Sequence, residues 1–222
     1  MELTAKKTDY VREPKQNRSR ASLERLLKAA AELLAQRGYN EFTLQEVSKK
    51  AKVSIGSIYN RFNGKENLIR QIQENELNAL EIESAVIINQ IRRKNLKLRQ
   101  LVPEVISQYA NLLDSYKGIM RPLMEISATD EVVATYGKQH AAENISDFMQ
   151  LLLERKDEIR QPDPQSAVEH SFRYIYASLA RFLGLGIMDS VSGEGDWEEM
   201  LQTLSSITLH YLLGHPDDLK DK

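Results

Sequence analysis

The stretch 43-TLQEVSKKAKVSIGSIYNRF-62 decides the fold, because it encodes two short helices joined by a tight turn. Thr43 and Glu46 match a capping box, in which threonine caps the helix start and glutamate reaches back. Ser54 is a favoured N-cap for the second helix. Apolar residues then recur three and four positions apart, at Ile55, Ile58, Tyr59 and Phe62. The pattern predicts a helix-turn-helix, a motif that places its second helix in the DNA major groove.

Helical signals continue on both sides of this motif, and no convincing strand alternation appears. Residues 20–37 carry an apolar stripe at helical spacing, and Gly38 suits the left-handed residue that ends many helices. We expect Gly118 to break a later helix and Pro122 to kink one. The further helices are predicted at 65–93, 96–115, 118–127, 130–156, 165–184 and 196–213. The fold class is therefore all-α.

Composition limits the functional classes. The 222 residues are 41% hydrophobic and 28% charged, which is typical of a soluble globular protein, and the absence of cysteine excludes disulfides and thiolate chemistry. The net charge of −2 is unevenly distributed. Residues 1–65 hold 14 basic and 7 acidic residues, or +7, and the remainder is −9. A basic N-terminal third favours a polyanionic partner. No secretory signal is visible, so we expect a cytoplasmic protein associated with the bacterial nucleoid.

The exposed side of the predicted motif carries side chains suited to phosphates and base edges. Thr43 opens a helix whose amides can bind a phosphate, and lysines 49, 50 and 52 add positive charge near the turn. Gly56 leaves bare backbone that permits close approach to DNA. Thr43 is a helix cap as well, Tyr59 is partly core in an alternative interpretation, and Arg61 is either a DNA contact or a solvated charge.

The stretch from about Ser22 to Ile72 resembles the DNA-binding domain of the TetR family of transcriptional regulators. The matching residues are Arg37-Gly38-Tyr39, Thr43, Val53-Ser54, Gly56-Ser57, Tyr59, Phe62 and Lys65-Glu66. The turn Asn63-Gly64 departs from the family pattern, which often has proline there. The resemblance implies phosphate contacts for some residues of the motif and base contacts for others. The predicted DNA-binding residues are Thr43, Lys52, Ser54, Ile55, Gly56, Ser57, Tyr59, Asn60 and Lys65.

The resemblance also implies how the chain is divided. Residues 1–18 are expected to be a flexible basic arm, 19–66 the helix-turn-helix DNA-binding domain, and 67–222 a helical domain for ligand binding and dimerisation. The last two long helices of two copies would form a four-helix bundle. Small residues at i, i+3 and i+7 fit such close packing, although ordinary packing within one chain is the alternative. The predicted interface residues are Ala177, Ala180, Gly184, Leu204, Ile207 and Tyr211.

A small-molecule effector is implied by the resemblance, whereas no cofactor or metal is expected. Aromatic and methionine side chains of the middle helices would suit an apolar, planar ligand, and arginines would supply polar contacts. For each of these residues, a core or surface role is the alternative. The candidate pocket residues are Tyr109, Met120, Arg121, Met124, Phe148, Arg173 and Tyr174.

These observations favour a ligand-responsive repressor that binds a palindromic DNA operator as a homodimer. A ligand-responsive activator with the same architecture and a helical protein-interaction adaptor remain alternatives. An enzyme is not expected, because the four histidines have no metal-ligand spacing and no Gly-rich phosphate loop is present. Whether residues 1–18 contact DNA stays open.

Overall fold

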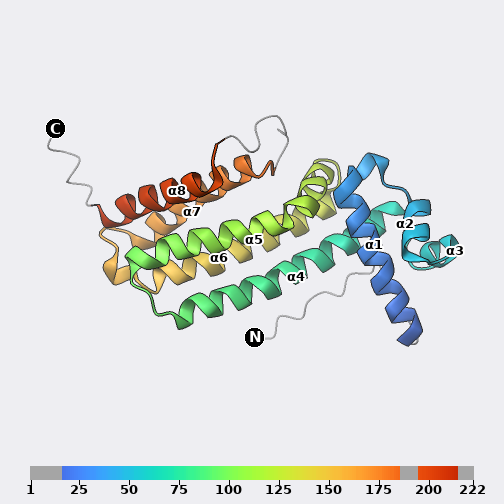
Figure 1. Ribbon diagram of the computed structural model, residues 1–222, viewed down its shortest axis with the longest axis horizontal. Helices are drawn as coiled ribbons and strands as arrows, with labels where there is room; N and C mark the ends of the chain where they lie inside the picture. Colours follow the sequence, from blue (N-terminus) through green and yellow to red (C-terminus); the bar gives the residue numbers. More distant parts are fainter. Residues whose placement is uncertain (1–16, 186–194, 215–222) are drawn as a thin grey trace. The chain divides into compact units, whose positions relative to one another are not determined.

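The computed structural model describes residues 17–185 and 195–214, and all regular structure in these residues is helical (Figure 1). The prediction of an all-α fold with a helix-turn-helix and a long helix from Lys65 is confirmed. The helices are α1 (Asn17–Glu41), α2 (Leu44–Ala51), α3 (Ile55–Tyr59), α4 (Lys65–Arg93), α5 (Leu98–Ser127), α6 (Glu131–Leu153), the short 3-10 helix η1 (Lys156–Glu158), α7 (Pro164–Phe182) and α8 (Trp197–Leu213).

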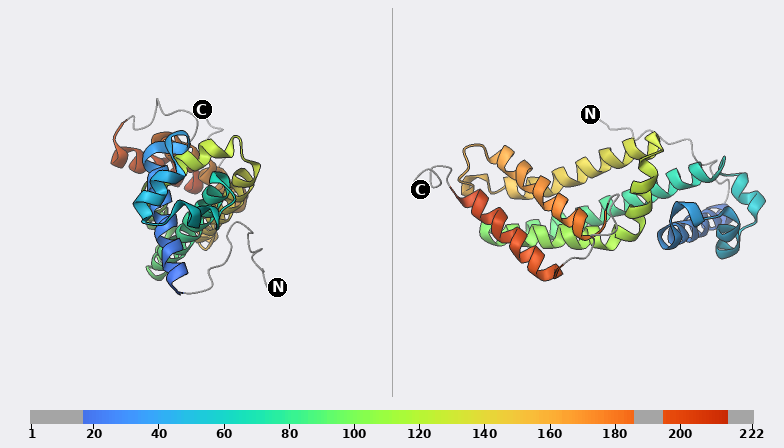
Figure 2. Two further views of the ribbon diagram at one scale, coloured as in Figure 1. Left: turned by 90° about the vertical axis from the view of Figure 1, so that its right-hand side faces the viewer. Right: turned by 90° about the horizontal axis from the view of Figure 1, so that it is seen from above.

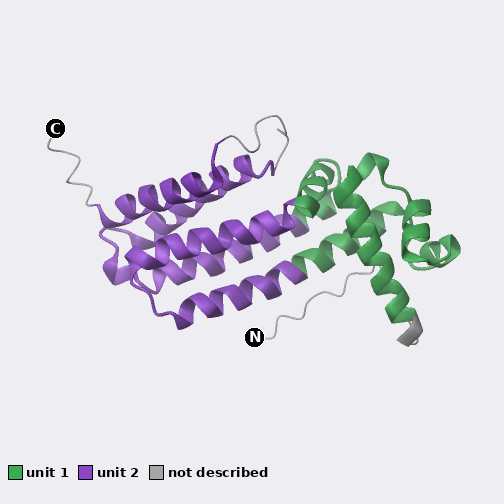
Figure 3. Cartoon of the chain, viewed as in Figure 1, with its two compact units in different colours: residues 1–78, 118–135 green, residues 79–117, 136–222 purple. Residues whose placement is uncertain are grey.

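The helices form two compact units, coloured separately in Figure 3. The first comprises Met1–Asn78 and Gly118–Thr135, so it joins α1, α2, α3 and the start of α4 to the end of α5 and the start of α6. Its core contains fully buried side chains from each part of the motif, namely Leu26, Leu34, Phe42, Val47, Ile58, Phe62 and Leu68. Of the basic arm expected at 1–18, residues 1–16 lie outside the described residues, and Asn17 and Arg18 open α1.

The second unit comprises Ala79–Lys117 and Tyr136–Lys222. Its core is built around Tyr109, whose ring centroid lies 5.0 Å from that of Phe148 and 5.9 Å from that of Phe172. Aromatic pairs at these separations add to the free energy gained by burial. Figures 1 and 2 show α7 and α8 side by side in this unit. Among the described residues, no helix has both the length and the apolar character needed to cross a lipid bilayer.

The predicted break at Gly118 is wrong, because α5 runs without interruption from Leu98 to Ser127. Glycine costs a helix only about 1 kcal/mol relative to alanine, which tertiary packing easily offsets. Here a Cβ on Gly118 would lie 3.9 Å from the Cβ of Ala35, so this turn of α5 passes close to α1 within the first unit. Pro122 lies in the same continuous helix with its side chain buried.

Two expected boundaries differ in detail from the structure. At Gly38 the backbone has φ 70° and ψ 178°, a conformation open essentially to glycine, yet helical structure resumes and α1 continues to Glu41. The domain boundary predicted at 66/67 falls inside α4, whereas the compact units divide after Asn78. The functional division into 19–66 and 67–222 stays a prediction.

Candidate nucleic-acid interface

The turn between α2 and α3 is held by local hydrogen bonds that the sequence encodes. The Thr43 hydroxyl accepts a bond from the Glu46 amide at 3.3 Å and donates one to the Glu46 carboxylate at 2.9 Å. At the other end of α2, the Ser48 hydroxyl donates to the Val53 carbonyl at 2.6 Å, and the Val53 amide donates back to the Ser48 carbonyl at 3.1 Å. The entry of α2 and its exit toward α3 are therefore both fixed by short-range contacts.

Lys52 closes α2 in a left-handed conformation, with φ 53° and ψ 46°. For a residue with a Cβ this conformation costs roughly 1–2 kcal/mol, and glycine is the residue that usually occupies it. The chain therefore keeps a lysine where glycine would be less strained. Its side chain is exposed beside α3.

The helix α3 is anchored on one side and open on the other. The Ser54 hydroxyl caps it by accepting a bond from the Ser57 amide at 3.2 Å, and Ile58 is completely buried. Next to this buried residue, the helix presents Ile55, 36% exposed, and Tyr59, 57% exposed, to solvent. Of the predicted DNA-binding residues, Thr43, Lys52, Ser54, Ile55, Gly56, Tyr59 and Asn60 are exposed, and Ser57 and Lys65 are half-buried.

Gly56 is an exposed residue of α3, and none of the described residues requires a glycine there. Its φ is negative, and a Cβ built on it meets no atom within 4 Å. An alanine would therefore fit without strain among the described residues. A bare backbone at this position agrees with close approach to DNA.

Lys65 has partners within its own chain. Its ammonium donates a hydrogen bond to the Tyr39 carbonyl and lies 4.0 Å from the centroid of the Tyr39 ring. Burial lowers the pKa of Lys65 from its ordinary value, although the nearby Glu66 carboxylate acts in the opposite direction. This lysine ties the end of α1 to the start of α4, so its predicted contact with a phosphate would be an additional role.

Arg61 connects elements that are far apart in the sequence. Its guanidinium donates to the Ser19 carbonyl at 3.2 Å, to the Ser19 hydroxyl at 3.1 Å and to the Ser22 hydroxyl at 3.3 Å. These bonds fix the residues after α3 against the start of α1. Sequence reasoning had placed Arg61 at the DNA or in solvent and had missed this role, because no local pattern links positions 39 and 42 residues apart.

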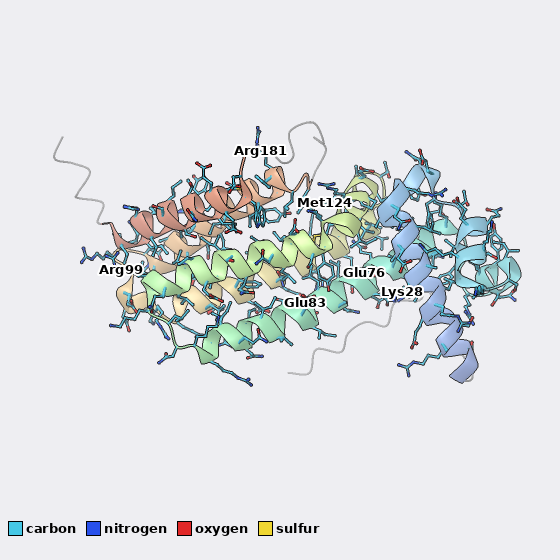
Figure 4. All side chains as sticks on the ribbon, in the orientation of Figure 1. Lys28, Glu76, Glu83, Arg99, Met124 and Arg181 are labelled. Carbon is cyan, nitrogen blue, oxygen red and sulfur yellow. The ribbon has the colours of Figure 1, made fainter. Side chains whose placement is uncertain are left out.

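The positive charge of the first unit is only partly neutralised by neighbouring carboxylates. Lys50 is paired with Glu32 at 2.9 Å, and Arg37 is paired with Glu46. Lys49 and Lys52 are exposed beside the turn, and neither forms an ion pair with another described residue. Lys28, labelled in Figure 4, adds an exposed charge on α1. A helix-turn-helix with lysines beside an exposed second helix has the chemistry of a DNA-reading head.

The comparison with protein families agrees with this geometry. Residues 26–72 match the model of the family described as bacterial regulatory proteins, tetR family. These residues include α2, α3 and the turn between them, so the DNA-binding domain of this chain is similar to that of the tetR family. A curated relative, the fatty acid metabolism regulator protein of Bacillus subtilis (strain 168), is 26% identical over a match that covers 40% of this chain. That match spans 62% of the relative's length.

Solved structures extend the similarity of fold beyond the DNA-binding domain. A protein from Mesorhizobium loti MAFF303099, assigned to the TetR family of transcriptional regulators, aligns with a TM-score of 0.71 over 89% of this chain and 98% of its own, at 15% identity. The fatty acid degradation regulator from Bacillus halodurans aligns with a TM-score of 0.57 over 84% of this chain and 97% of its own, at 16% identity. The helical second unit therefore shares the TetR-like fold.

The residues predicted for an effector pocket are divided between the two units. Met120, Arg121 and Met124 lie in the first unit, and the other four lie in the second. Tyr109 and Phe148 are buried core residues in mutual contact, whereas Arg173 is exposed and Tyr174 is 74% exposed. Such positions agree with the alternative of core and surface roles for these residues, and the seven-residue pocket stays a prediction.

A groove within the second unit went unnoticed in the sequence. It has a volume of about 620 Å³ and lies between the start of α5 and α8. Arg99, labelled in Figure 4, and His210 lie along it, and the His210 Nδ1 atom is 2.7 Å from the Ser206 carbonyl. Apolar side chains complete the lining, among them Pro103, Leu201, Leu209 and Leu213. No sequence motif predicts this groove, because its two sides are formed by segments about a hundred residues apart in the sequence.

The predicted dimer residues divide into buried and exposed sets. Leu204 is buried by its own chain. Gly184 has φ 63° and ends α7, because its amide bonds to the Arg181 carbonyl at 3.2 Å and the next amide bonds to the Ala180 carbonyl at 2.8 Å. This turn is a sufficient reason for the glycine. Ala177, Ile207 and Tyr211 are exposed and Ala180 is half-buried, so these residues are accessible to a second copy.

Proposed function

We propose that this protein is a transcriptional regulator that binds a palindromic DNA operator as a homodimer and represses transcription until a small molecule binds. The observation that carries the proposal is the exposed surface of α3. Ser54 caps this helix and Ile58 anchors it in the core, and Lys49 and Lys52 are exposed nearby. The match of residues 26–72 to a family of bacterial regulatory proteins supports the same conclusion. We infer that the protein works on DNA in the cytoplasm and is not an enzyme.

The homodimer is supported by the outer face of α7 and α8. Tyr174, Ile207 and Tyr211 expose 74%, 60% and 40% of their surfaces there. Ile207 and Tyr211 are four residues apart and so lie on the same side of α8, and large exposed apolar side chains favour contact with another protein surface. Two copies joined at this face would present two reading heads to half-sites one helical turn apart, roughly 34–36 Å. Binding at both half-sites multiplies the affinity of each head.

The class of effector is suggested by the names of the relatives. The curated relative regulates fatty acid metabolism, and one of the similar solved structures is a regulator of fatty acid degradation. An effector derived from fatty acids would be amphipathic. The groove between α5 and α8 offers a basic end and apolar sides, which suit an anionic head and an aliphatic body. The effector shifts the DNA-binding equilibrium only by its different affinity for the two states.

The proposal is tested by selecting duplexes from a randomised DNA pool and titrating salt against the selected operator. We expect enrichment of a palindrome and an affinity that falls steeply with salt, with a slope of about −0.9 for each phosphate neutralised. Transcription in vitro from a promoter carrying the operator then separates repression from activation. Absence of any enriched sequence, together with salt-independent binding to a protein partner, would instead support the adaptor alternative.

A further inference from the structure

The first turn of α3 contains a partly exposed apolar side chain next to a bare backbone. Ile55 is 36% exposed, whereas Ile58, three residues later, is completely buried. Gly56 has open space around the position of a Cβ. A single exposed isoleucine is unremarkable on an ordinary surface. Here it lies on the element that a helix-turn-helix inserts into the major groove, where every exposed group is a candidate for reading base edges.

The hydroxyl groups that cap α2 and α3 form hydrogen bonds within the chain. The Ser54 hydroxyl accepts the Ser57 amide, and the Thr43 hydroxyl donates to the Glu46 carboxylate. Gly56 has no side chain to contribute. Ile55 and Gly56, the first two residues of α3, therefore offer no side-chain donor or acceptor of the kind that distinguishes guanine, adenine and cytosine by paired hydrogen bonds.

The major groove displays one apolar feature that identifies a base, the C5-methyl group of thymine. An exposed aliphatic side chain recognises this group by van der Waals contact and by excluding water. The exposed lysines 49 and 52 complement the phosphates on either side, so duplex DNA is the partner whose charge fits this surface.

We propose that Ile55 is a specificity-determining residue that selects a thymine in each operator half-site through contact with its C5-methyl group. The bare backbone at Gly56 lets the helix approach closely enough for that contact. The inference rests on the proposed function, since it names what the reading head recognises.

The test replaces thymine by deoxyuridine, a change that removes only the methyl group. In the operator selected from random duplexes, each thymine is replaced first singly and then together with its symmetry-related thymine, and binding is measured at constant salt. Burial of one methyl-sized group contributes a factor of about four in affinity, so replacement in both half-sites should weaken binding about fifteen-fold. We expect this loss at one symmetry-related pair of thymines and little change at thymines outside the contact.

A variant shows whether Ile55 is responsible. Ile55→Ala should weaken binding to the thymine operator by a similar factor and should no longer distinguish thymine from deoxyuridine at that position, because the contact is already lost. Val132→Ala, at another exposed apolar residue of the same unit, is the matched control and should keep the full sensitivity. Thermal unfolding of both variants confirms that they fold.

The outcomes separate the two proposals. If an operator is selected but no deoxyuridine substitution weakens binding, or if Ile55→Ala keeps the sensitivity to the methyl group, the assignment of Ile55 is overturned and the DNA-binding function stands. If no DNA sequence is enriched at all, both are overturned.

Discussion

Two exposed faces of this protein differ in the chemistry they offer to solvent. The face around α3 carries lysines and small polar residues, and α2 and α3 are capped at their N-terminal ends. Among the described residues of α2 and α3, Ile55 is the only exposed large aliphatic side chain. The face of α7 and α8 exposes Tyr174, Ile207 and Tyr211, and none of these is needed to complete the core of its own unit. Both faces are exposed to solvent in the isolated chain. Contact with water is unfavourable for the apolar side chains of α7 and α8 and favourable for the polar side chains around α3.

The difference indicates two kinds of partner. A surface rich in lysine and hydroxyl groups is well hydrated on its own and gains from neutralising phosphates, so its affinity depends on salt. An apolar face gains by removing its area from water, so it depends only weakly on salt. If the first face binds DNA, substitutions there should change how DNA affinity depends on salt. If the second face binds another copy of the chain, substitutions there should change dimer formation.

The largest expected effect comes from a charge on the apolar face. Ile207→Glu would bury a carboxylate between two copies, where it has no partner, and should convert the dimer to a monomer at micromolar concentration. Without the second head, operator affinity should fall about 100-fold or more. Sedimentation and operator binding measure the two effects, and the affinity of one isolated head for non-specific duplex should change little.

The α4 helix provides a matched control for this experiment. Ile82 is 69% exposed, compared with 60% for Ile207, so both substitutions add a charge at an exposed isoleucine. Ile82→Glu should leave the dimer and operator affinity unchanged. A monomer produced by Ile82→Glu but not by Ile207→Glu would move the proposed interface to α4.

A smaller effect is expected at the turn between α2 and α3, where one substitution should raise the stability of the fold and weaken DNA binding. Lys52→Gly relieves the left-handed strain at φ 53°, and the gain is partly offset by the greater freedom of glycine in the unfolded chain. Unfolding by denaturant should show the variant about 0.5 kcal/mol more stable. The salt slope of operator binding should become less negative by about 0.9 for each reading head, because one phosphate contact is lost.

Lys49→Gln is a control that distinguishes the loss of a positive charge from the relief of backbone strain. Lys49 is exposed in the last turn of α2 with helical geometry, so its replacement removes a nearby charge and relieves no strain. It should reduce the salt slope to a similar extent and leave the stability unchanged. A gain in stability without any change in salt slope for Lys52→Gly would show that Lys52 does not touch DNA.

The two faces also differ in how much of them the sequence reveals. The caps at Thr43 and Ser54 and the buried Ile58 follow from local spacing, and the structure has them as predicted. Local rules were sufficient there, because the hydrogen bonds of the two caps and of the turn between α2 and α3 join residues three to five positions apart. This is why the reading head, and the resemblance it carries, was predictable from about fifty residues.

Long-range contacts escaped the same reasoning. Arg70 binds Asp130 at 2.9 Å, and the Gln73 side chain donates to the Val133 carbonyl at 2.8 Å, which attaches the start of α6 to α4 inside the first unit. Each pair is 60 residues apart, and no periodicity relates its members. The expected break at Gly118 failed for a similar reason, since packing against Ala35 outweighs the intrinsic helix propensity of one glycine.

The smallest expected effect concerns a carboxyl group that belongs to neither face. Glu76 lies half-buried on α4 (Figure 4), and burial raises its pKa above the ordinary value. Because the folded chain then holds this proton more tightly than the unfolded chain, the contribution of Glu76 to stability is complete below the ordinary pKa and is lost as the pH rises through the raised pKa. Glu76→Gln should therefore raise the melting temperature by about 1–3 °C at pH 7.5 and leave it unchanged near pH 4. Since the carboxyl group faces neither DNA nor a second copy, the salt slope and the sedimentation of the variant should match those of the parent protein. A gain of equal size at both pH values would mean that side-chain packing, rather than the buried charge, is responsible.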